Sequence, residues 1–381
     1  MAKENQLFTT EYKKYYFELS DWLGYGADIL LVDSCRNVGK SFQADRLPRN
    51  QFKKYHYTTI FLKRRPVDIT TGYILGLRDE LNKFRDENDK IDFYFRDGDR
   101  KEGIVDVYIT KEDFKTKSNV FIRILALNIG ADRIKNSKLQ ACKYVVFDEY
   151  KIDARRINQK YLNGEYDLFK EFYYTYVRFA PEGLKCIFLG NAYSDYSPYQ
   201  EGLKIDTNQI KLGCILTGKA GRFNYVYTKY KPSQELIEKL IGNDPDILKD
   251  KYERFAILGE AVNDTNILTY DHLPAHFTLR YVIKSQGKTL GVYKYDNSGR
   301  TEENVNFAYY VQEIEWKAEY KRQIFCFEIQ DLADGTIMPT RELISYLAPI
   351  RVALQFRNMA FKNIGDYYTL EYLYTFIPDR I

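Results

Sequence analysis

The chain has 381 residues, of which 45% are hydrophobic and 29% charged, and its formal net charge is +4. This length exceeds that of a usual single domain, so two domains with full cores are expected. No run approaches the roughly 20 apolar residues of a membrane-spanning helix, and residues 1–6 lack an apolar signal segment. These features exclude a membrane-spanning chain and predict a protein without a secretory signal.

The small positive charge permits nucleic-acid binding without requiring it. Basic clusters at Lys53-Lys54, Lys63-Arg64-Arg65 and Arg100-Lys101 could contact phosphates, and solvated faces explain them equally well. The 35 tyrosines could stack on bases, but a chain rich in Tyr, Lys, Ile and Asn also follows from an AT-rich genome. We favour the second explanation.

The cysteines and histidines indicate neither a disulfide framework nor a zinc site. Only three histidines are present, and the five cysteines are odd in number, widely spaced and without a C-x-x-C pair. The chain is therefore expected to work in a reducing cytoplasm. The cysteines are Cys35, Cys142, Cys186, Cys214 and Cys326.

The first predicted element is an apolar strand at 29–33 that runs into a Gly-Lys-Ser turn. A strand, such a turn and a short helix, here at 42–47 and ended near Pro48, are typical of a nucleotide-binding P-loop. Lys40 would reach the β- and γ-phosphates and the Ser41 hydroxyl would bind Mg²⁺. Ser34 stands where the common pattern has glycine. Backbone N–H groups would surround the phosphates, so the predicted nucleotide-binding residues are Arg36, Asn37, Val38, Gly39, Lys40 and Ser41.

The second half of the predicted site is the strand at 144–148, which ends in Asp148-Glu149. This is the Walker B pattern, in which Asp148 would hold Mg²⁺ through water and Glu149 would orient and deprotonate the attacking water. The adjacent glutamate favours a hydrolytic motor over a kinase, which needs no such base. The alternative is a buried strand whose last two acids are merely solvated.

Further strands are predicted at 58–63, 121–127 and 186–190, several of them separated by helix-compatible stretches. This alternation predicts an α/β fold with a mostly parallel sheet and ligands at the carboxyl ends of the strands. The strand at 121–127 falls between the P-loop and Walker B, where ring-forming hydrolases usually have an additional strand. A loop-rich stretch through 194–198 and a helix at 232–240 follow.

A second Gly-Lys-Thr tripeptide, at 287–289, joins the short β-rich runs 281–284 and 290–295 without a helix signal. It is predicted to be a hairpin turn. The later residues show β-like runs followed by helix-like ones. We expect an ATPase domain at 1–205, a linker or lid at 206–265 and a smaller domain at 266–381.

Together these motifs resemble the DNA-packaging ATPases of tailed phages, and most closely the compact type of small protein-primed phages, relatives of the large terminase subunits. The likeness rests on Arg36 in the P-loop, on 58–66 with its ending Lys63-Arg64-Arg65-Pro66, on Asp148-Glu149, and on the strand ending in Gly190-Asn191. It implies an ASCE-type ATPase that uses ATP and Mg²⁺ and forms a ring, with five as the expected number of subunits. In the host cytoplasm this ring would dock transiently on the portal, or connector, at the vertex of an empty procapsid and drive double-stranded DNA inward.

The resemblance assigns roles to single residues. Lys40 and Ser41 resemble the phosphate and Mg²⁺ ligands, Asp148 the metal support and Glu149 the catalytic base. Asn191 resembles the position that senses the γ-phosphate, with an asparagine in a turn as an equal alternative. Arg36 either reaches the phosphates or pairs with Asp33.

The family also needs a cation from a neighbouring subunit, because charge builds on the γ-phosphoryl oxygens in the transition state. Arg178 is the first choice for this catalytic role, and Lys135 and Arg133 are the next. Each of the three is also explained as an ordinary surface charge.

Large terminases carry a C-terminal nuclease of RNase H type, in which acids on the first strand help to hold two metal ions. The corresponding strand here, at 277–284, has no carboxylate. The later acids Glu313, Glu315, Glu328 and Asp331 are expected to be exposed. We therefore expect an α+β, RNase H-like vestigial nuclease domain that binds DNA or the motor's partners. Two alternatives stay open for the whole chain: another P-loop DNA translocase or helicase, and a non-enzymatic DNA-binding structural protein.

Overall fold

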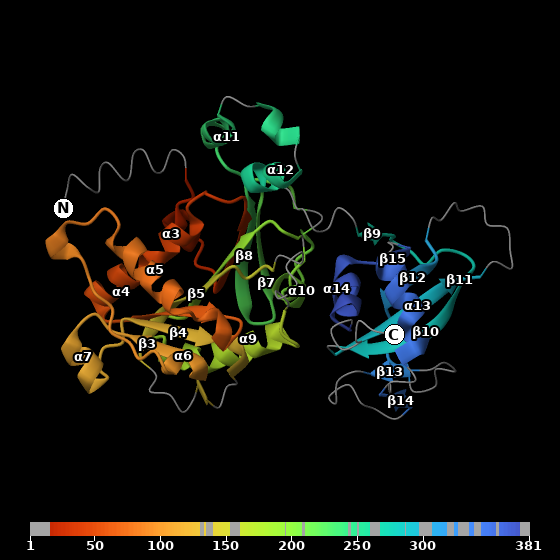
Figure 1. The fold of residues 1–381 in the computed structure, drawn as a ribbon, viewed down its shortest axis with the longest axis horizontal. Helices are drawn as coiled ribbons and strands as arrows, with labels where there is room; N and C mark the ends of the chain where they lie inside the picture. Colours follow the sequence, from red (N-terminus) through yellow and green to blue (C-terminus); the bar gives the residue numbers. More distant parts are fainter. Residues whose placement is uncertain are drawn as a thin grey trace. The chain divides into compact units, whose positions relative to one another are not determined.

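The computed structural model describes two compact units, and the main boundary between them falls at residues 262 and 263. Figure 1 shows the elements of both units along the chain. The described residues are 16–129, 133–134, 140–152, 161–194, 196–207, 210–242, 245–249, 251–259, 267–285, 287–296, 307–317, 324–326, 335–338, 344–355 and 358–373.

The first unit is built on an eight-stranded sheet in the order β3-β4-β2-β5-β6-β1-β8-β7. The two edge strands β3 and β7 pair antiparallel with their neighbours, and the other pairings are parallel. The predicted α/β fold with a mostly parallel sheet is therefore confirmed. The strands are β1 (Ile29–Ser34), β2 (Thr58–Lys63), β3 (Ile104–Val107), β4 (Ile122–Ala126), β5 (Cys142–Asp148), β6 (Lys185–Asn191), β7 (Ile215–Ala220) and β8 (Phe223–Tyr230).

Strands β7 and β8 correct the expectation that 206–265 is a linker or lid beside the ATPase domain. β8 pairs in parallel with β1, the strand that leads into the predicted P-loop, with Val32 opposite Thr228, so both strands belong to one sheet. Outside the sheet lie α11 (Gln234–Ile241), η6 (Pro245–Lys249) and α12 (Lys251–Leu258). Figure 1 shows α11 and α12 at one end of the β7–β8 hairpin. The β-rich run Phe223–Tyr230 is visible in the sequence, but nothing local indicates that it joins β1.

The helices begin and end at recognisable signals. Ser233 accepts from the Leu236 N–H at the start of α11, which confirms the helix predicted at 232–240. The helix predicted at 42–47 is two helices, because Pro48 lies in the first turn of α4, where proline loses no hydrogen bond. The other helices of this unit are α2 (Leu19–Leu23), α3 (Lys40–Asp45), α4 (Leu47–Tyr55), α5 (Thr71–Asn82), α6 (Asp99–Glu102), α7 (Lys111–Thr116), α9 (Glu165–Tyr176) and α10 (Pro198–Gly202). Among the described residues, no helix has the length and apolar character needed to cross a bilayer.

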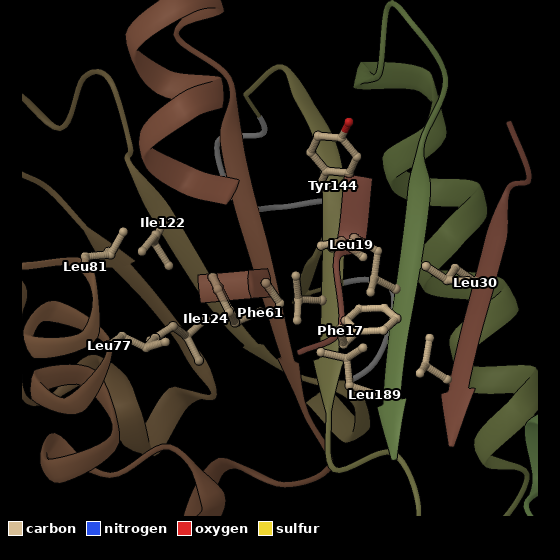
Figure 2. Close-up of a cluster of buried hydrophobic side chains, with 14 of the residues drawn as sticks. Phe17, Leu19, Leu30, Phe61, Leu77, Leu81, Ile122, Ile124, Tyr144 and Leu189 are labelled. Atoms are coloured by element: carbon tan, nitrogen blue, oxygen red, sulfur yellow. The ribbon is translucent and has the colours of Figure 1, made fainter. Parts of the chain in front are cut away.

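The main core lies on the face of the sheet that packs against α3, α4 and α5. Figure 2 shows Leu30, Phe61, Ile122, Ile124, Tyr144 and Leu189, from five strands, and places Ile122 and Ile124 beside Leu77 and Leu81 of α5. Side chains alternate between the faces of a strand. The last residues of four strands therefore project toward this same face, at the carboxyl edge of the sheet. These residues are Ser34, Lys63, Asp148 and Asn191.

The second unit has a seven-stranded sheet in the order β14-β13-β10-β11-β12-β15-β9. β10 to β12 form an antiparallel meander, and β13 runs parallel to β10. Ser285 pairs with Lys288 across a turn in which Gly287 has a φ of 73°, so the predicted hairpin is confirmed. Apolar residues of β10 to β13 pack against α13 and α14. The elements are β9 (Leu268–Thr269), β10 (Phe277–Ser285), β11 (Lys288–Tyr295), β12 (Tyr309–Glu313), β13 (Ile324–Cys326), β14 (Thr336–Ile337), α13 (Ile344–Gln355), β15 (Met359–Phe361) and α14 (Ile364–Leu373).

Candidate nucleotide-binding site

The turn between β1 and α3 closes around the Lys40 side chain. Asn37 and Gly39 have φ angles of 61° and 83°, the left-handed conformation that glycine adopts most easily and asparagine tolerates. Lys40, 7% exposed, donates to Ser34 Oγ at 2.6 Å, the Cys35 carbonyl at 3.0 Å and Asn191 Oδ1 at 3.4 Å. All three acceptors are neutral oxygens. A buried ammonium whose hydrogen-bond acceptors are neutral oxygens keeps an uncompensated part of its charge, and beside a helix N-terminus this favours an anion.

Ser34 takes the place of the usual P-loop glycine without strain. It is the last residue of β1 and pairs with Asn191 of β6, and its own φ angle is not positive. Its hydroxyl accepts from Lys40 and donates to the Cys35 carbonyl at 2.8 Å. A side chain is therefore accommodated where the common motif has none, because the loop turns at Asn37 and Gly39 instead.

Strand β6 lies between β1 and β5, the strands predicted to carry the P-loop and the Walker B motif, so Asn191 stands next to both halves of the predicted site. The strand predicted at 121–127 exists as β4, on the far side of β2. Phe61 pairs with Val146, which brings Lys63 and Asp148, two residues further along, to the same level. The sheet therefore brings Lys40, Asn191 and Asp148 together. It also places Lys63 beside them, a residue that the sequence had not assigned to the site.

Charges around Asp148 shift one another's pKa values. Burial lowers the pKa of Lys40 and of Lys63, and in both cases nearby Asp148 opposes the shift. Burial raises the pKa of Asp45, one turn after Ser41 on α3, and Asp148 adds to this rise. A divalent cation beside Asp148 would fit this cluster, because its charge offsets the repulsion between the carboxylates.

Asp45→Asn is expected to raise the unfolding temperature at neutral pH. Because burial, Asp148 and Glu80 raise its pKa, Asp45 binds a proton more tightly in the folded than in the unfolded state. Ionised Asp45 therefore destabilises the folded state. This destabilisation is absent below the unfolded pKa of about 3.9 and grows as the pH rises above it. Thermal unfolding at pH 7 and near pH 4 should show the gain only at pH 7. An equal gain at both values would contradict this assignment.

Glu149 follows β5 in an unusual backbone conformation, with a φ of 60°. Its N–H donates to Asp148 Oδ1 at 3.0 Å, and Arg64 donates to its carbonyl at 3.0 Å and to that of Tyr150. Left-handed backbone is costly for a glutamate and persists only where the surroundings hold it. Arg64 and Asp148 supply that support from both sides.

Arg64 is itself fixed by a buried carboxylate. Its Nε lies 3.0 Å from both oxygens of Glu165, whose side chain is fully buried, and Tyr199 donates to Glu165 Oε1 at 2.8 Å. The sequence shows Arg64 only as part of a basic cluster. Its position directly after a strand that neighbours the Walker B strand is the signal that could have singled it out.

Arg36 and the loop are covered by other parts of the first unit. Asp33 pairs with Lys151 at 2.6 Å, which corrects the alternative that it pairs with Arg36. The Arg36 guanidinium donates to Tyr193 Oη at 2.6 Å, and the backbone N–H of Arg36 donates to the Ala256 carbonyl of α12 at 3.1 Å. A Cβ on Gly259 would lie 2.9 Å from the Cys35 nitrogen, so the end of α12 packs directly on the loop.

Of the predicted trans-acting residues, Arg178 lies away from this chain's own site. Arg178 is exposed in η4 (Val177–Phe179), after α9 has run back from the carboxyl edge of the sheet toward the start of β6. Arg133 is exposed and pairs with Glu102 at 3.5 Å. Lys135 lies outside the described residues. A role for Arg178 in a neighbouring subunit therefore stays a prediction.

Comparison with known proteins shows the fold to be that of phage DNA-packaging motors. The structure called "The Phi-28 gp11 DNA packaging Motor" matches with a TM-score of 0.53 and 16% identity, over 91% of this chain and 94% of that one. The bacteriophage Phi-29 viral genome packaging motor assembly matches with a TM-score of 0.55 and 16% identity, over 95% and 98%. No protein-family model matches the sequence, and no curated protein is significantly similar to it. The likeness seen in the motifs thus extends to the fold of nearly the whole chain.

Proposed function

We propose that the chain is an ATP hydrolase, the subunit of a ring-shaped motor that drives double-stranded viral DNA into a preformed capsid. One observation carries the proposal: Lys40, Asn191 and Asp148, with Glu149 next to it, meet at one edge of the sheet. The fold shared with two packaging motors supports it.

In this proposal the loop 36–41 and the start of α3 bind the ATP phosphates, with Lys40 on the β- and γ-phosphates. Ser41 and Asp148 would hold Mg²⁺, which would supply positive charge to offset that of the ATP phosphates. Glu149 accepts a proton from the attacking water, and Arg64 keeps its backbone in place. Asn191, bonded to Lys40, responds to the presence of the γ-phosphate.

The second unit is proposed to be an RNase H-like domain that has lost cleavage and binds DNA or the portal. Its meander with a parallel strand beside β10 supports this, and β10 carries no carboxylate. Glu313 and Glu315 are exposed as expected, whereas Glu328 and Asp331 lie outside the described residues. No group of three potential metal ligands occurs in the part of the chain that the structure describes. The site of action would be the portal vertex of the procapsid, in the host cytoplasm.

The motor proposal is tested by the ATPase rate with and without double-stranded DNA, together with the mass in solution with ATP. We expect turnover that DNA stimulates and a ring, with five as the expected subunit number. A helicase would instead unwind a forked duplex, and a structural DNA-binding protein would show no turnover. Either result would contradict the proposal.

Mixing two inactive variants should restore activity if Arg178 acts in trans. Arg178→Ala and Glu149→Gln each impair every site, but in mixed rings some interfaces combine an intact Arg178 with an intact Glu149. ATPase rate across mixing ratios measures the recovery. Arg222→Ala, at an exposed arginine of the β7–β8 hairpin, is the control and should keep its activity. Absence of recovery in subunits that demonstrably co-assemble would argue for a role in cis or none.

Supercoiled DNA incubated with the full chain and Mn²⁺ should remain intact. The first strand of the second unit lacks a carboxylate to hold metal, while Lys284, Lys288 and Lys294 on β10 and β11 add positive charge that favours phosphate contacts. Binding to DNA should weaken steeply with salt, because such contacts release counterions. Gel electrophoresis and salt titration measure both. Nicking that disappears in Glu313→Gln would show that the second unit is an active, terminase-like nuclease, and would contradict this prediction.

A further inference from the structure

A buried ion pair lies on the other face of the sheet from Ser34 and Asp148. Asp33 precedes Ser34 in β1, and Lys151 follows Glu149 by two residues. Their Oδ2 and Nζ atoms are 2.6 Å apart, and the two side chains are only 2% and 1% exposed. The pair thus joins the strand that leads into the P-loop to the chain that leaves the proposed catalytic base.

Both ends of this pair are bonded to further parts of the site. Asp33 accepts from Tyr150 Oη at 2.6 Å, Tyr227 Oη at 2.8 Å and Gln200 Nε2 at 3.1 Å. Lys151 also donates to the Ser194 carbonyl at 2.5 Å, in the loop that follows Asn191. The two consecutive residues after Glu149 are therefore anchored to one carboxylate, and the loop of the proposed γ-phosphate sensor is bonded to the same lysine.

The backbone of β6 makes room for this arrangement. Gly190 pairs with Asp33 in the sheet, and a Cβ on Gly190 would lie 2.7 Å from Tyr150 Cε1 and 2.9 Å from Asp33 Oδ1. Both distances are too short for a real contact. The Tyr150 ring can reach Asp33 only because the residue before Asn191 is glycine.

Stability alone is a poor explanation for such a pair. Taking two charges out of water costs about as much as their attraction returns, so well-packed apolar residues often stabilise as much or more. A buried pair can instead impose one arrangement on the segments that it joins. Here these segments carry Lys40, Glu149 and Asn191, the residues whose relative positions hydrolysis would depend on.

We propose that Lys151 and Asp33 are positioning residues of the ATP site. By fixing the chain on the carboxyl side of Glu149, while Arg64 fixes its carbonyl, they aim the Glu149 carboxylate at the water that attacks the γ-phosphate. This inference rests on the proposed ATPase function. It predicts that the pair affects turnover and not nucleotide affinity, because a misplacement of about 1 Å can cost on the order of 100-fold in rate.

The test compares Lys151→Met with the double variant Asp33→Asn, Lys151→Met in the full chain. The single variant leaves Asp33 buried without its cation and should unfold at a lower temperature. The double variant removes both charges and should recover much of that loss. Its turnover should nevertheless stay about tenfold or more below wild type, with the Kd for a fluorescent ATP analogue changed by less than about threefold.

A partly buried ion pair elsewhere in the same sheet serves as the control. Arg123 of β4, whose side chain is 3% exposed, pairs at 2.6 Å with Asp106 of β3, whose side chain is 25% exposed, away from the carboxyl edge. The double variant Asp106→Asn, Arg123→Met should match the site variant in unfolding temperature and keep turnover within about twofold of wild type. Tyr150→Phe removes a single hydroxyl and so disturbs folding less than the loss of a charge. It should reduce turnover about threefold or more without a change in Kd.

Three results separate the possible failures. Turnover that recovers together with the unfolding temperature in the double variant, or normal turnover in Tyr150→Phe, would make the pair structural and overturn the inference alone. A fall in nucleotide affinity equal to the fall in turnover would also overturn it. A wild-type chain without ATP turnover would contradict the proposed function, and the inference with it.

Discussion

Glu149→Gln is expected to abolish ATP hydrolysis while leaving ATP binding nearly intact. The substitution removes the proton acceptor, which contributes typically about 10²- to 10⁴-fold to a rate, and it keeps the size of the side chain. Two contacts hold the backbone of residue 149: its N–H donates to Asp148, and Arg64 donates to its carbonyl. Neither contact involves the Glu149 carboxylate. Steady-state turnover and equilibrium binding of a fluorescent ATP analogue measure the two effects separately.

Glu182→Gln is the matched control for that experiment. Glu182 is an exposed carboxylate that pairs with Lys143 at 2.5 Å, near the start of β5 and so at the other end of the Walker B strand. A surface pair of this kind contributes little to stability, so turnover and unfolding should both stay close to wild type. Near-normal turnover in Glu149→Gln would contradict the assignment of the Walker B motif.

Arg64→Leu is expected to lower the free energy of unfolding by about 3–5 kcal/mol, the cost of leaving one partner of a buried ion pair without the other. Glu165 would remain fully buried with its charge, and the carbonyls of Glu149 and Tyr150 would lose their donor. Turnover should fall to background, because the left-handed backbone at Glu149 loses its support. Urea unfolding and ATPase rate measure the two losses.

Tyr199→Phe separates the ion pair from the rest of this cluster. It removes one hydrogen bond to Glu165 and leaves Arg64 in place, so a loss of about 1–3 kcal/mol is expected, with turnover largely retained. If Arg64→Leu cost no more than Tyr199→Phe, the Arg64–Glu165 pair would not be the main support of this region. If Arg64→Leu folded stably with normal turnover, Arg64 would have no part in positioning Glu149.

Local patterns in the sequence were sufficient for the two strands of the site and for one turn of the second unit. The apolar run before Gly39-Lys40-Ser41, the apolar run before Asp148-Glu149 and the turn at Gly287 each depend on neighbouring residues only. Strand periodicity and turn chemistry act over a few residues, which is why these predictions were confirmed in the structure. The boundary at Pro48 was misplaced because proline both ends and begins helices, and only packing distinguishes the two.

The order of the strands and the second set of site residues came only from the tertiary structure. No local pattern shows that β6 lies between β1 and β5, or that β8 pairs with β1 and so belongs to the sheet of the first unit. Arg64 meets Glu165 across 101 residues of chain, and Asp33 meets Tyr150 across 117. In the sequence nothing distinguishes these residues from other polar and charged residues in or near strands and helices. Their roles come from burial and from partners that only the folded sheet brings within hydrogen-bonding distance. A polar or charged group that loses its water on burial must find such partners, or its burial destabilises the fold.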